Sequence, residues 1–155
     1  MPREIGEKVV STNRKARHDY LIEETYEAGM VLSGTEVKSL RAGRASLVDG
    51  YAFIEGGEVW LDAVHIQEYM AGTWTNHPPR RKRKLLLHKQ EIRKLYSRTQ
   101  EKGQSVIPLK AFFKNGKVKI LLGVGRGKKT HDRRQDLKKR TDKREMERAI
   151  RGRNR

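Results

Sequence analysis

The chain contains no cysteine, and only 6% of its 155 residues are aromatic. The absence of cysteine excludes a disulfide framework and any zinc site built from cysteine. No apolar run reaches the length of a membrane span, and the opening residues MPREIGEKVV lack the apolar segment of a secretion signal. We therefore expect a cytoplasmic protein with no membrane partner, no bound metal and no cofactor.

Acidic residues are also scarce, because 36 Lys and Arg stand against 19 Asp and Glu. The imbalance is largest in residues 126–155, where 14 Lys and Arg face 5 Asp and Glu. Such a polar segment buries too little apolar surface to offset the entropy of ordering, so we expect it to be disordered in isolation. Blocks of positive charge are typical of tails that bind nucleic acid. A purely solubilising tail is the alternative.

The same tail has the composition of a helix. No Gly or Pro lies between Lys128 and Arg151, and good helix formers dominate. Met146, Ala149 and Ile150 form a stripe too narrow to stabilise an isolated helix in water. We expect residues 126–155 to become helical against RNA or protein.

The rest of the chain divides into a flexible arm at residues 1–12 and one folded domain at residues 13–125. We expect the protein to be a monomer. Residues 20–32 are rich in strand formers and predict one strand, or two strands broken at Gly29. Two more strands are predicted at about 50–55 and 58–64, joined by the hairpin turn Gly56-Gly57.

Two short helices are predicted within this domain. The first follows Thr35, which suits its N-cap, and ends at Gly43. The second covers about His88 to Lys102 and ends at Gly103. Residues 65–84 are less regular, and Pro78-Pro79 excludes a helix there.

The clearest structural signal is a hairpin around the turn Asn115-Gly116. Pairing outward from this turn places an apolar set on one face: Leu109, Ala111, Phe113, Val118, Ile120 and Leu122. The opposite face holds four lysines together with Phe112 and Leu121. Phe112 is then either an exposed base-stacking residue or a residue packed beneath another element.

About six strands with two or three short helices predict a mainly β fold. A small antiparallel barrel of the oligonucleotide-binding (OB) kind fits this size. A half-open sheet covered by helices is the rival architecture.

Basic residues cluster in three places before the tail: Asn13 to His18, then Lys38 with Arg41 and Arg44, then Arg80 to Lys84. Lys and Arg at this density suit phosphates, and Arg also stacks on bases. One such cluster is most simply a solvated surface, but three clusters plus the tail favour nucleic-acid binding. The absence of a helix-turn-helix or zinc pattern favours RNA over sequence-specific DNA.

An enzymatic function is not expected. None of the five histidines lies in a metalloprotease or deaminase pattern, and the segment GVGRGKKT has the wrong spacing for a phosphate loop. His18 and Asp19 are adjacent, which on a strand would point them to opposite faces.

Four ordered segments of the chain resemble the signatures of the small protein B (SmpB) family of tmRNA-binding proteins. They are NRKARHDYLIEETYEAG, GTEVKSLRAG, RKRKLLLHKQEI and GKVKILLGVGRGKKTHDRRQD, and together they run from about Asn13 to about Lys139. The resemblance implies an OB-like barrel that binds the tRNA-like domain of tmRNA in place of an anticodon arm. It further implies delivery of alanyl-tmRNA, with elongation factor Tu, to ribosomes stalled on broken messages.

The resemblance also implies roles for particular residues. In the family's tmRNA-binding surface the matching positions are Asn13, Glu27 and Leu86. Neighbouring basic and polar side chains are candidate RNA contacts by their chemistry: Lys15, Arg17, His18, Lys38, Arg41, Arg83 and Lys84. Glu27 would accept hydrogen bonds from base or 2′-OH donors, or else it is a strand-end or bulge residue; Leu86 would pack under a base, or else it is a core leucine.

In the tail, the resemblance implies a helix that forms in the empty mRNA path beyond the decoding centre, against small-subunit rRNA. The candidate residues are Gly127, Lys128, Lys129, His131, Asp132, Arg133, Arg134, Leu137 and Ile150. The tail has no aromatic residue, so Leu137 and Ile150 are weaker substitutes for a stacking anchor. The runner-up function is a general RNA-binding translation factor of OB type, resembling initiation factor one, without tmRNA specificity.

Overall fold

The computed structural model describes residues 6–68, 78–128 and 130–153. The elements follow in the order β1 (Glu7–Thr12), α1 (Arg14–Asp19), β2 (Tyr20–Met30), α2 (Gly34–Arg41), β3 (Ala45–Ser46), β4 (Tyr51–Glu55), β5 (Glu58–Asp62), β6 (His65–Ile66), β7 (Arg83–Leu86), α3 (Lys89–Thr99), β8 (Gln104–Lys114), β9 (Lys117–Gly127) and α4 (Thr130–Arg153). The mainly β prediction is confirmed.

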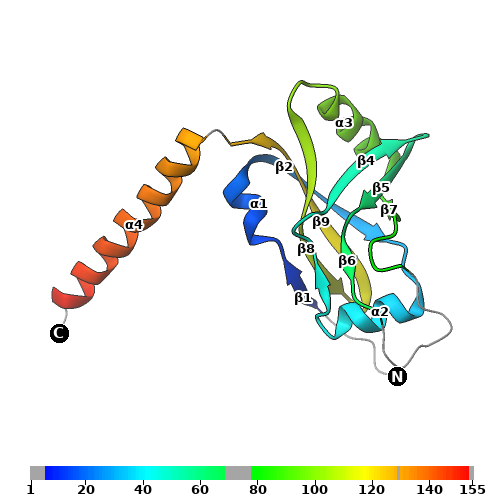
Figure 1. Ribbon diagram of the computed structural model, residues 1–155, viewed down its shortest axis with the longest axis horizontal. Helices are drawn as coiled ribbons and strands as arrows, with labels where there is room; N and C mark the ends of the chain where they lie inside the picture. The colour runs from blue at the N-terminus through cyan, green and yellow to red at the C-terminus, as the bar shows by residue number, and fades with distance from the viewer. Residues whose placement is uncertain (1–5, 69–77, 129, 154–155) are drawn as a thin grey trace.

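Six antiparallel strands close into a ring in the order β8-β4-β5-β7-β2-β9, with β9 returning to β8. Strand β8 reaches three partners because it is long: its start pairs with β4 at Val106, and its end pairs with β1 at residues 110–114. The predicted barrel is therefore confirmed, and the half-open sheet is wrong. Figure 1 shows α2 and α3 at opposite ends of the barrel and α4 projecting away from it.

Residues 7–12 correct the prediction of a flexible arm. They form β1, which pairs antiparallel with β8 from Glu7 opposite Lys114 to Thr12 opposite Lys110. The segment is mostly polar, but Val10 packs against the core, and the pairing satisfies backbone groups along one edge of β8. Residues 1–5 lie outside the described residues.

Glycine turns set the predicted hairpins. Gly56 and Gly57 both have positive φ, as a two-residue primed turn requires, and so do Asn115 and Gly116. The predicted pairing of Lys114 with Lys117 and of Ala111 with Ile120 is confirmed. Gly43 and Gly103 also adopt positive φ after α2 and α3. The helix predicted to follow Thr35 is α2, and its N-cap is Ser33, which forms a capping box with Glu36.

A bulge between Pro108 and Lys110 changes which face Leu109 occupies. Leu109 packs with Ile107 and Ala16 in a small cluster beneath α1, whereas Ala111 and Phe113 belong to the main core. The extra residue of a bulge breaks the strict alternation that the sequence pattern assumed. Phe112 is buried, 1% exposed, so its packed alternative is the one that the structure supports.

The predicted strand at residues 20–32 is continuous through Gly29, and its bulge lies between Ile22 and Glu24. Gly125 of β9 faces this bulge, where an added Cβ would lie 2.0 Å from the Leu21 carbonyl oxygen. Only glycine fits such a close approach of two backbones. Strand packing therefore explains this glycine of the GVGRG segment.

Candidate nucleic-acid interface

The segment Asn13–Asp19 forms α1 and its cap, and Asn13 is buried beneath the helix. Its side-chain oxygen accepts a hydrogen bond from the Ala16 backbone N–H at 3.2 Å. Its amide nitrogen donates to the carbonyls of Leu47 at 3.1 Å and Pro108 at 2.9 Å. With a side chain this fully engaged and only 2% exposed, Asn13 has no surface left for RNA. The expectation of direct RNA contact by Asn13 is corrected: this residue fixes α1 to the barrel.

The basic side chains of α1 point away from the barrel. Lys15 and Arg17 are exposed, and His18 is partly exposed with its Nδ1 atom 3.0 Å from the Asp19 carboxylate. Helix α1 is therefore fixed to the barrel through Asn13 and carries exposed cations on its outer side. We call this helix, with Lys15, Arg17 and His18, the α1 mount. Lys15, Arg17 and His18 thus remain available as RNA contacts.

The first residues of the tail join this mount. The Lys128 backbone N–H donates to the Asp19 carbonyl at 2.8 Å, and its ammonium donates to the Arg17 carbonyl at 3.0 Å. A cation at the C-terminal end of a helix satisfies carbonyls that lack partners within the helix. The tail therefore leaves the barrel beside α1, immediately after Gly127.

Glu27 and Leu86, far apart in the sequence, line one hollow of about 470 Å³. Gly29 of β2 pairs with Leu86 of β7, and this register brings Glu27 to the same surface. Leu86 is 53% exposed, which excludes the core-leucine alternative. Glu27 is paired within β2 opposite Leu121, so it is neither a strand end nor the site of the bulge.

The hollow combines apolar surface with charge of both signs. Its walls are Glu27, Leu86, Leu87, His88, Glu91 and Lys119. The Glu27 carboxylate lies 3.4 Å from the Lys114 ammonium, and both groups are partly exposed. An exposed leucine next to a carboxylate acceptor offers a base one face for packing and one edge for hydrogen bonding.

Arg83 corrects a second expectation, because it is only 1% exposed. Its Nε donates to Glu36 at 2.7 Å, and its terminal nitrogens donate to the carbonyls of Val64 at 2.7 Å and Pro79 at 2.9 Å. These partners occupy the guanidinium, so it cannot also bind a phosphate. Arg83 instead joins β7 to α2 and to the segment before β7.

Glu36 holds two arginines, since Arg81 also donates to its carboxylate from Nε at 3.2 Å. Burial disfavours the charged carboxylate, but hydrogen bonds from Arg81, the Ser33 N–H and Arg83 outweigh burial and hold the pKa of Glu36 below its ordinary value. Burial lowers the pKa of Arg83, and the facing Glu36 opposes that effect. Within Arg80 to Lys84, the basic run is therefore partly structural.

The other predicted cations are in separate places. Lys38 and Arg41 lie on α2, and the Arg41 guanidinium carbon is 4.9 Å from the centre of the Phe113 ring. Lys84 faces outward from β7 and pairs with Glu58 at 3.0 Å. The structure thus groups α1 with the tail origin, and Glu27 with Leu86, while the α2 cations lie at the barrel end seen at the bottom of Figure 1.

The tail is one helix, α4 (Thr130–Arg153). The side chains described on it, residues 138–151, are all exposed, including Ile150 at 59%. Lys129 lies outside the described residues, and so do the side chains of His131, Asp132, Arg133, Arg134 and Leu137. The predicted helix is present, while the change from disorder to helix on binding stays a prediction.

Sequence reasoning missed two features of this surface. No local pattern identifies Glu36 as an arginine partner, because 45 residues separate it from Arg81 in the chain. The outward aromatic residues of β4 and β5 were also missed, although alternation around Gly56-Gly57 could have revealed them.

Within residues 6–68, 78–128 and 130–153, no helix is apolar enough to span a membrane, and no three His, Asp or Glu residues converge as metal ligands.

Comparisons with known proteins agree on one family. The family model described as "SmpB protein" matches residues 10–152. The chain is 66% identical over 150 residues to the SsrA-binding protein of Clavibacter michiganensis subsp. michiganensis (strain NCPPB 382), covering 97% of this chain and 95% of the relative. It is 62% identical over 148 residues to the SsrA-binding protein of Thermobifida fusca (strain YX), covering 96% and 92%.

A solved structure supports the same fold. The chain resembles, with a TM-score of 0.67 and 52% identity, a chain from a structure described as "tmRNA-SmpB: a journey to the center of the bacterial ribosome". The likeness covers 77% of this chain and 85% of that chain.

Proposed function

Because the chain belongs to the SmpB family, we propose that it binds the tRNA-like domain of tmRNA and brings it to stalled ribosomes for trans-translation. The observation that carries this function is the 66% identity, over 97% of the chain, to a protein named for binding SsrA, the tmRNA. The barrel, the exposed cations of α1 and the basic helix α4 are the physical means.

The hollow at Glu27 and Leu86 is proposed to read the RNA. Leu86 offers about half of its surface for packing against a base, at a point where β7 is held in place by Arg83 below it. Glu27 accepts hydrogen bonds from an amino group or a 2′-OH, which charge alone does not distinguish. The hollow therefore supplies specificity, which separates this function from binding by a general translation factor.

The α1 mount is proposed to supply affinity. Lys15 and Arg17 are exposed on a helix whose base is fixed by Asn13, so they keep a constant spacing toward phosphates. Each phosphate neutralised in this way releases counterions and makes the affinity fall with salt. Lys128 lies beside the same helix, so RNA bound at α1 is adjacent to the origin of the tail.

The tail is proposed to act on the ribosome. Helix α4 carries a surplus of positive charge and an exposed pair, Met146 and Ile150, one turn apart. Such a helix fits the empty mRNA path, where rRNA phosphates surround it. We further propose that elongation factor Tu accompanies alanyl-tmRNA, that the protein acts in the cytoplasm with the ribosome, and that it catalyses no reaction.

A competition assay tests the specificity. The full chain is bound to the tRNA-like domain of tmRNA at near-physiological salt, with bulk tRNA in excess. Retained binding is expected, because the hollow distinguishes its RNA by shape and donors. Complete loss of binding to bulk tRNA would overturn tmRNA specificity and favour the general OB-type factor.

Removal of the tail tests the separation of the two modules. The chain should be cut before Thr130, since Gly127 pairs with Tyr20 and Lys128 bonds to α1. The truncated protein is expected to bind tmRNA nearly as well as the full chain, but to support no peptide tagging on stalled ribosomes. A comparable loss of tmRNA affinity would contradict this division of labour.

A further inference from the structure

The outer face of β4, β5 and β7 carries a group of aromatic residues. Along these strands the side chains that point into the barrel are buried: Ala52, Val59, Leu61, Arg83 and Leu85. The alternate positions therefore point outward. The register places Tyr51 beside Asp62, Phe53 beside Trp60, and Trp60 beside Lys84. We call Tyr51, Phe53 and Trp60 the aromatic platform.

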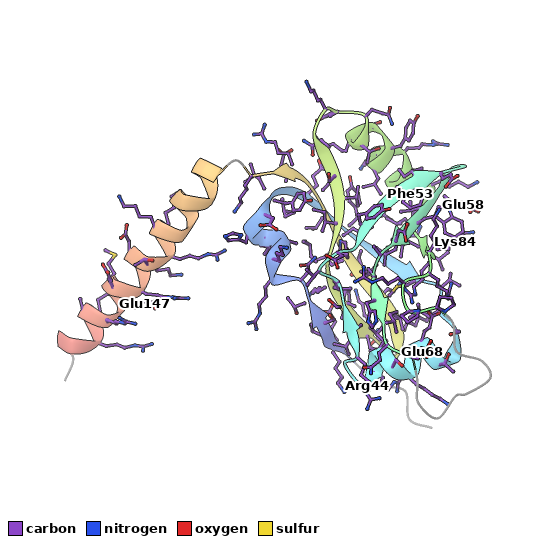
Figure 2. All side chains as sticks on the ribbon, in the orientation of Figure 1. Arg44, Phe53, Glu58, Glu68, Lys84 and Glu147 are labelled. Carbon is purple, nitrogen blue, oxygen red and sulfur yellow. The ribbon has the colours of Figure 1, made fainter. Side chains whose placement is uncertain are left out.

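The platform is arranged like a stacking surface. Tyr51 is 47% exposed, and Phe53 and Trp60 are partly exposed. The Tyr51 and Phe53 rings lie 6.1 Å apart with an interplanar angle of 36°, and the Lys82 ammonium is 5.2 Å from the Phe53 ring centre. Figure 2 shows Phe53, Glu58 and Lys84 on the side of the barrel away from α4.

Fold stability does not account for this grouping. Apart from Arg83, the buried side chains of these strands are aliphatic: Ala52, Val59, Leu61 and Leu85. Yet three of the ten aromatic residues in a chain poor in aromatics gather on one outward surface. Contiguous exposed aromatics are typical of binding sites, because their rings expose apolar area that a partner can cover.

We propose that the aromatic platform stacks unpaired bases of the tRNA-like domain of tmRNA. This inference rests on the proposed function and extends its RNA surface. Leu86 follows Lys84 on the same face of β7, so the platform continues into the hollow with Glu27. An RNA loop seated in the hollow therefore has neighbouring bases within reach of the rings. Every base has a π-face, so stacking here is tolerant of sequence.

The charges around the platform distinguish it from a phosphate site. Two cations, Lys82 and Lys84, share this region with the acidic residues Glu55, Glu58 and Asp62, so the local charge is nearly balanced. Glu58 already pairs with Lys84 at 3.0 Å, and Asp62 accepts from the Tyr51 hydroxyl at 3.2 Å. Binding at this surface gains little from counterion release. Loss of the platform is thus expected to weaken RNA binding equally at low and high salt.

Trp60 supplies a direct optical test. The chain has two tryptophans, and Trp74→Phe leaves Trp60 as the only one. The tRNA-like domain of tmRNA is titrated into this full-length variant, with filter binding measured in parallel. Quenching of Trp60 emission is expected to saturate together with binding. Unchanged emission with intact binding would overturn the platform but leave the proposed function standing, whereas no binding at all would overturn the proposed function.

A matched pair of variants tests the energetics. Phe53→Leu removes a platform ring and keeps an apolar side chain, while Tyr26→Leu removes a partly exposed ring on β2, away from the platform and from the cavity that Tyr51 and Phe53 line. Phe53→Leu is expected to lose about tenfold in affinity, the lower range for stacking one base, with the salt dependence unchanged. Tyr26→Leu is expected to bind normally. Equal affinities for both variants, each with a native thermal melt, would overturn the proposal.

A third arm separates tmRNA from ribosomal RNA. The same Trp74→Phe variant is mixed with purified small ribosomal subunits without tmRNA. Little quenching is expected, because the hollow that directs bases to the platform is proposed to belong to tmRNA. Quenching by the subunit alone, with none by the tRNA-like domain, would overturn the proposal by assigning the platform to rRNA.

Discussion

Replacing Glu36 by Gln tests whether the buried ion pair holds strand β7, which carries Leu86, in place. The Glu36 side chain is 6% exposed and its partner Arg83 is 1% exposed, so neither charge is solvated by water. Gln keeps the size of the side chain and one acceptor oxygen but removes the negative charge. Arg83 would then be buried without a counter-ion, a change that costs about 3–5 kcal/mol in other proteins.

The structure places the expected loss at the low end of this range. Arg83 keeps hydrogen bonds to the Val64 and Pro79 carbonyls, at 2.7 and 2.9 Å, and the amide oxygen of the substituted side chain can still accept from the Ser33 N–H that caps α2. We therefore expect Glu36→Gln to lower the free energy of unfolding by about 3 kcal/mol. Urea unfolding followed by circular dichroism at neutral pH measures this loss as a shifted midpoint with an unchanged slope.

Asp49→Asn is the matched control. It removes a carboxylate that also pairs with an arginine, Arg80, but both side chains are more than half exposed. Water solvates both ions, so the loss should stay below about 1 kcal/mol. If Glu36→Gln destabilises the chain no more than Asp49→Asn does, the buried pair is not what joins α2 to β7, and the reasoning fails.

Acid should reveal the same carboxylate. The pKa of Glu36 in the folded chain lies below its value of 4.5 in a free side chain. The stability that this difference supplies is complete above the unfolded pKa and is lost as the pH falls through the folded pKa. Glu36→Gln should lack this part of the acid destabilisation. Adding Arg83→Met should restore some stability to Glu36→Gln, because an apolar residue replaces the stranded charge.

Three further variants separate structural residues from RNA contacts. Asn13→Ala should lower the free energy of unfolding by about 1–2 kcal/mol, measured by urea unfolding, and should also weaken RNA binding by the folded fraction, because α1 and its cations are no longer fixed to the barrel. Leu86→Ala should reduce tmRNA affinity in filter binding with a nearly unchanged thermal melt, since the side chain is 53% exposed. Joint replacement of Lys15 and Arg17 by Ala should reduce the slope of log affinity against log salt by about two, and a slope equal to that of the wild type would remove α1 from the interface.

The hairpins and their register were predictable because local rules govern them. Asn115-Gly116 and Gly56-Gly57 fix both the turns and the pairing that extends from each. The bulge between Pro108 and Lys110 was not predictable, since no turn signal marks it and Leu109 packs there against Ala16, which is far away in the sequence. Residues 7–12 likewise form strand β1 by pairing with β8, a strand far away in the sequence.

The site was predictable in its chemistry but not in its geometry. Resemblance located Glu27 and Leu86, and only the β2–β7 register shows that they line one hollow. Resemblance also named Asn13, but the side chain acts from beneath the surface as a helix cap. Sequence patterns cannot distinguish a residue that touches RNA from one that positions the element that does so.

Charge counts illustrate the same difficulty. The run Arg80 to Lys84 reads as five equivalent cations, yet strand alternation buries Arg83 while leaving Lys82 and Lys84 on the outer face. Glu36 lowers the cost of that burial and at the same time neutralises positive charge close to the proposed RNA surface. The affinity of this chain for RNA should therefore depend on which cations its strands expose. Moving a single positive charge from position 83 to the outer face of β7 would remove the buried pair with Glu36 and so lower the stability of the fold. The same change would add an exposed cation and so raise the affinity for RNA.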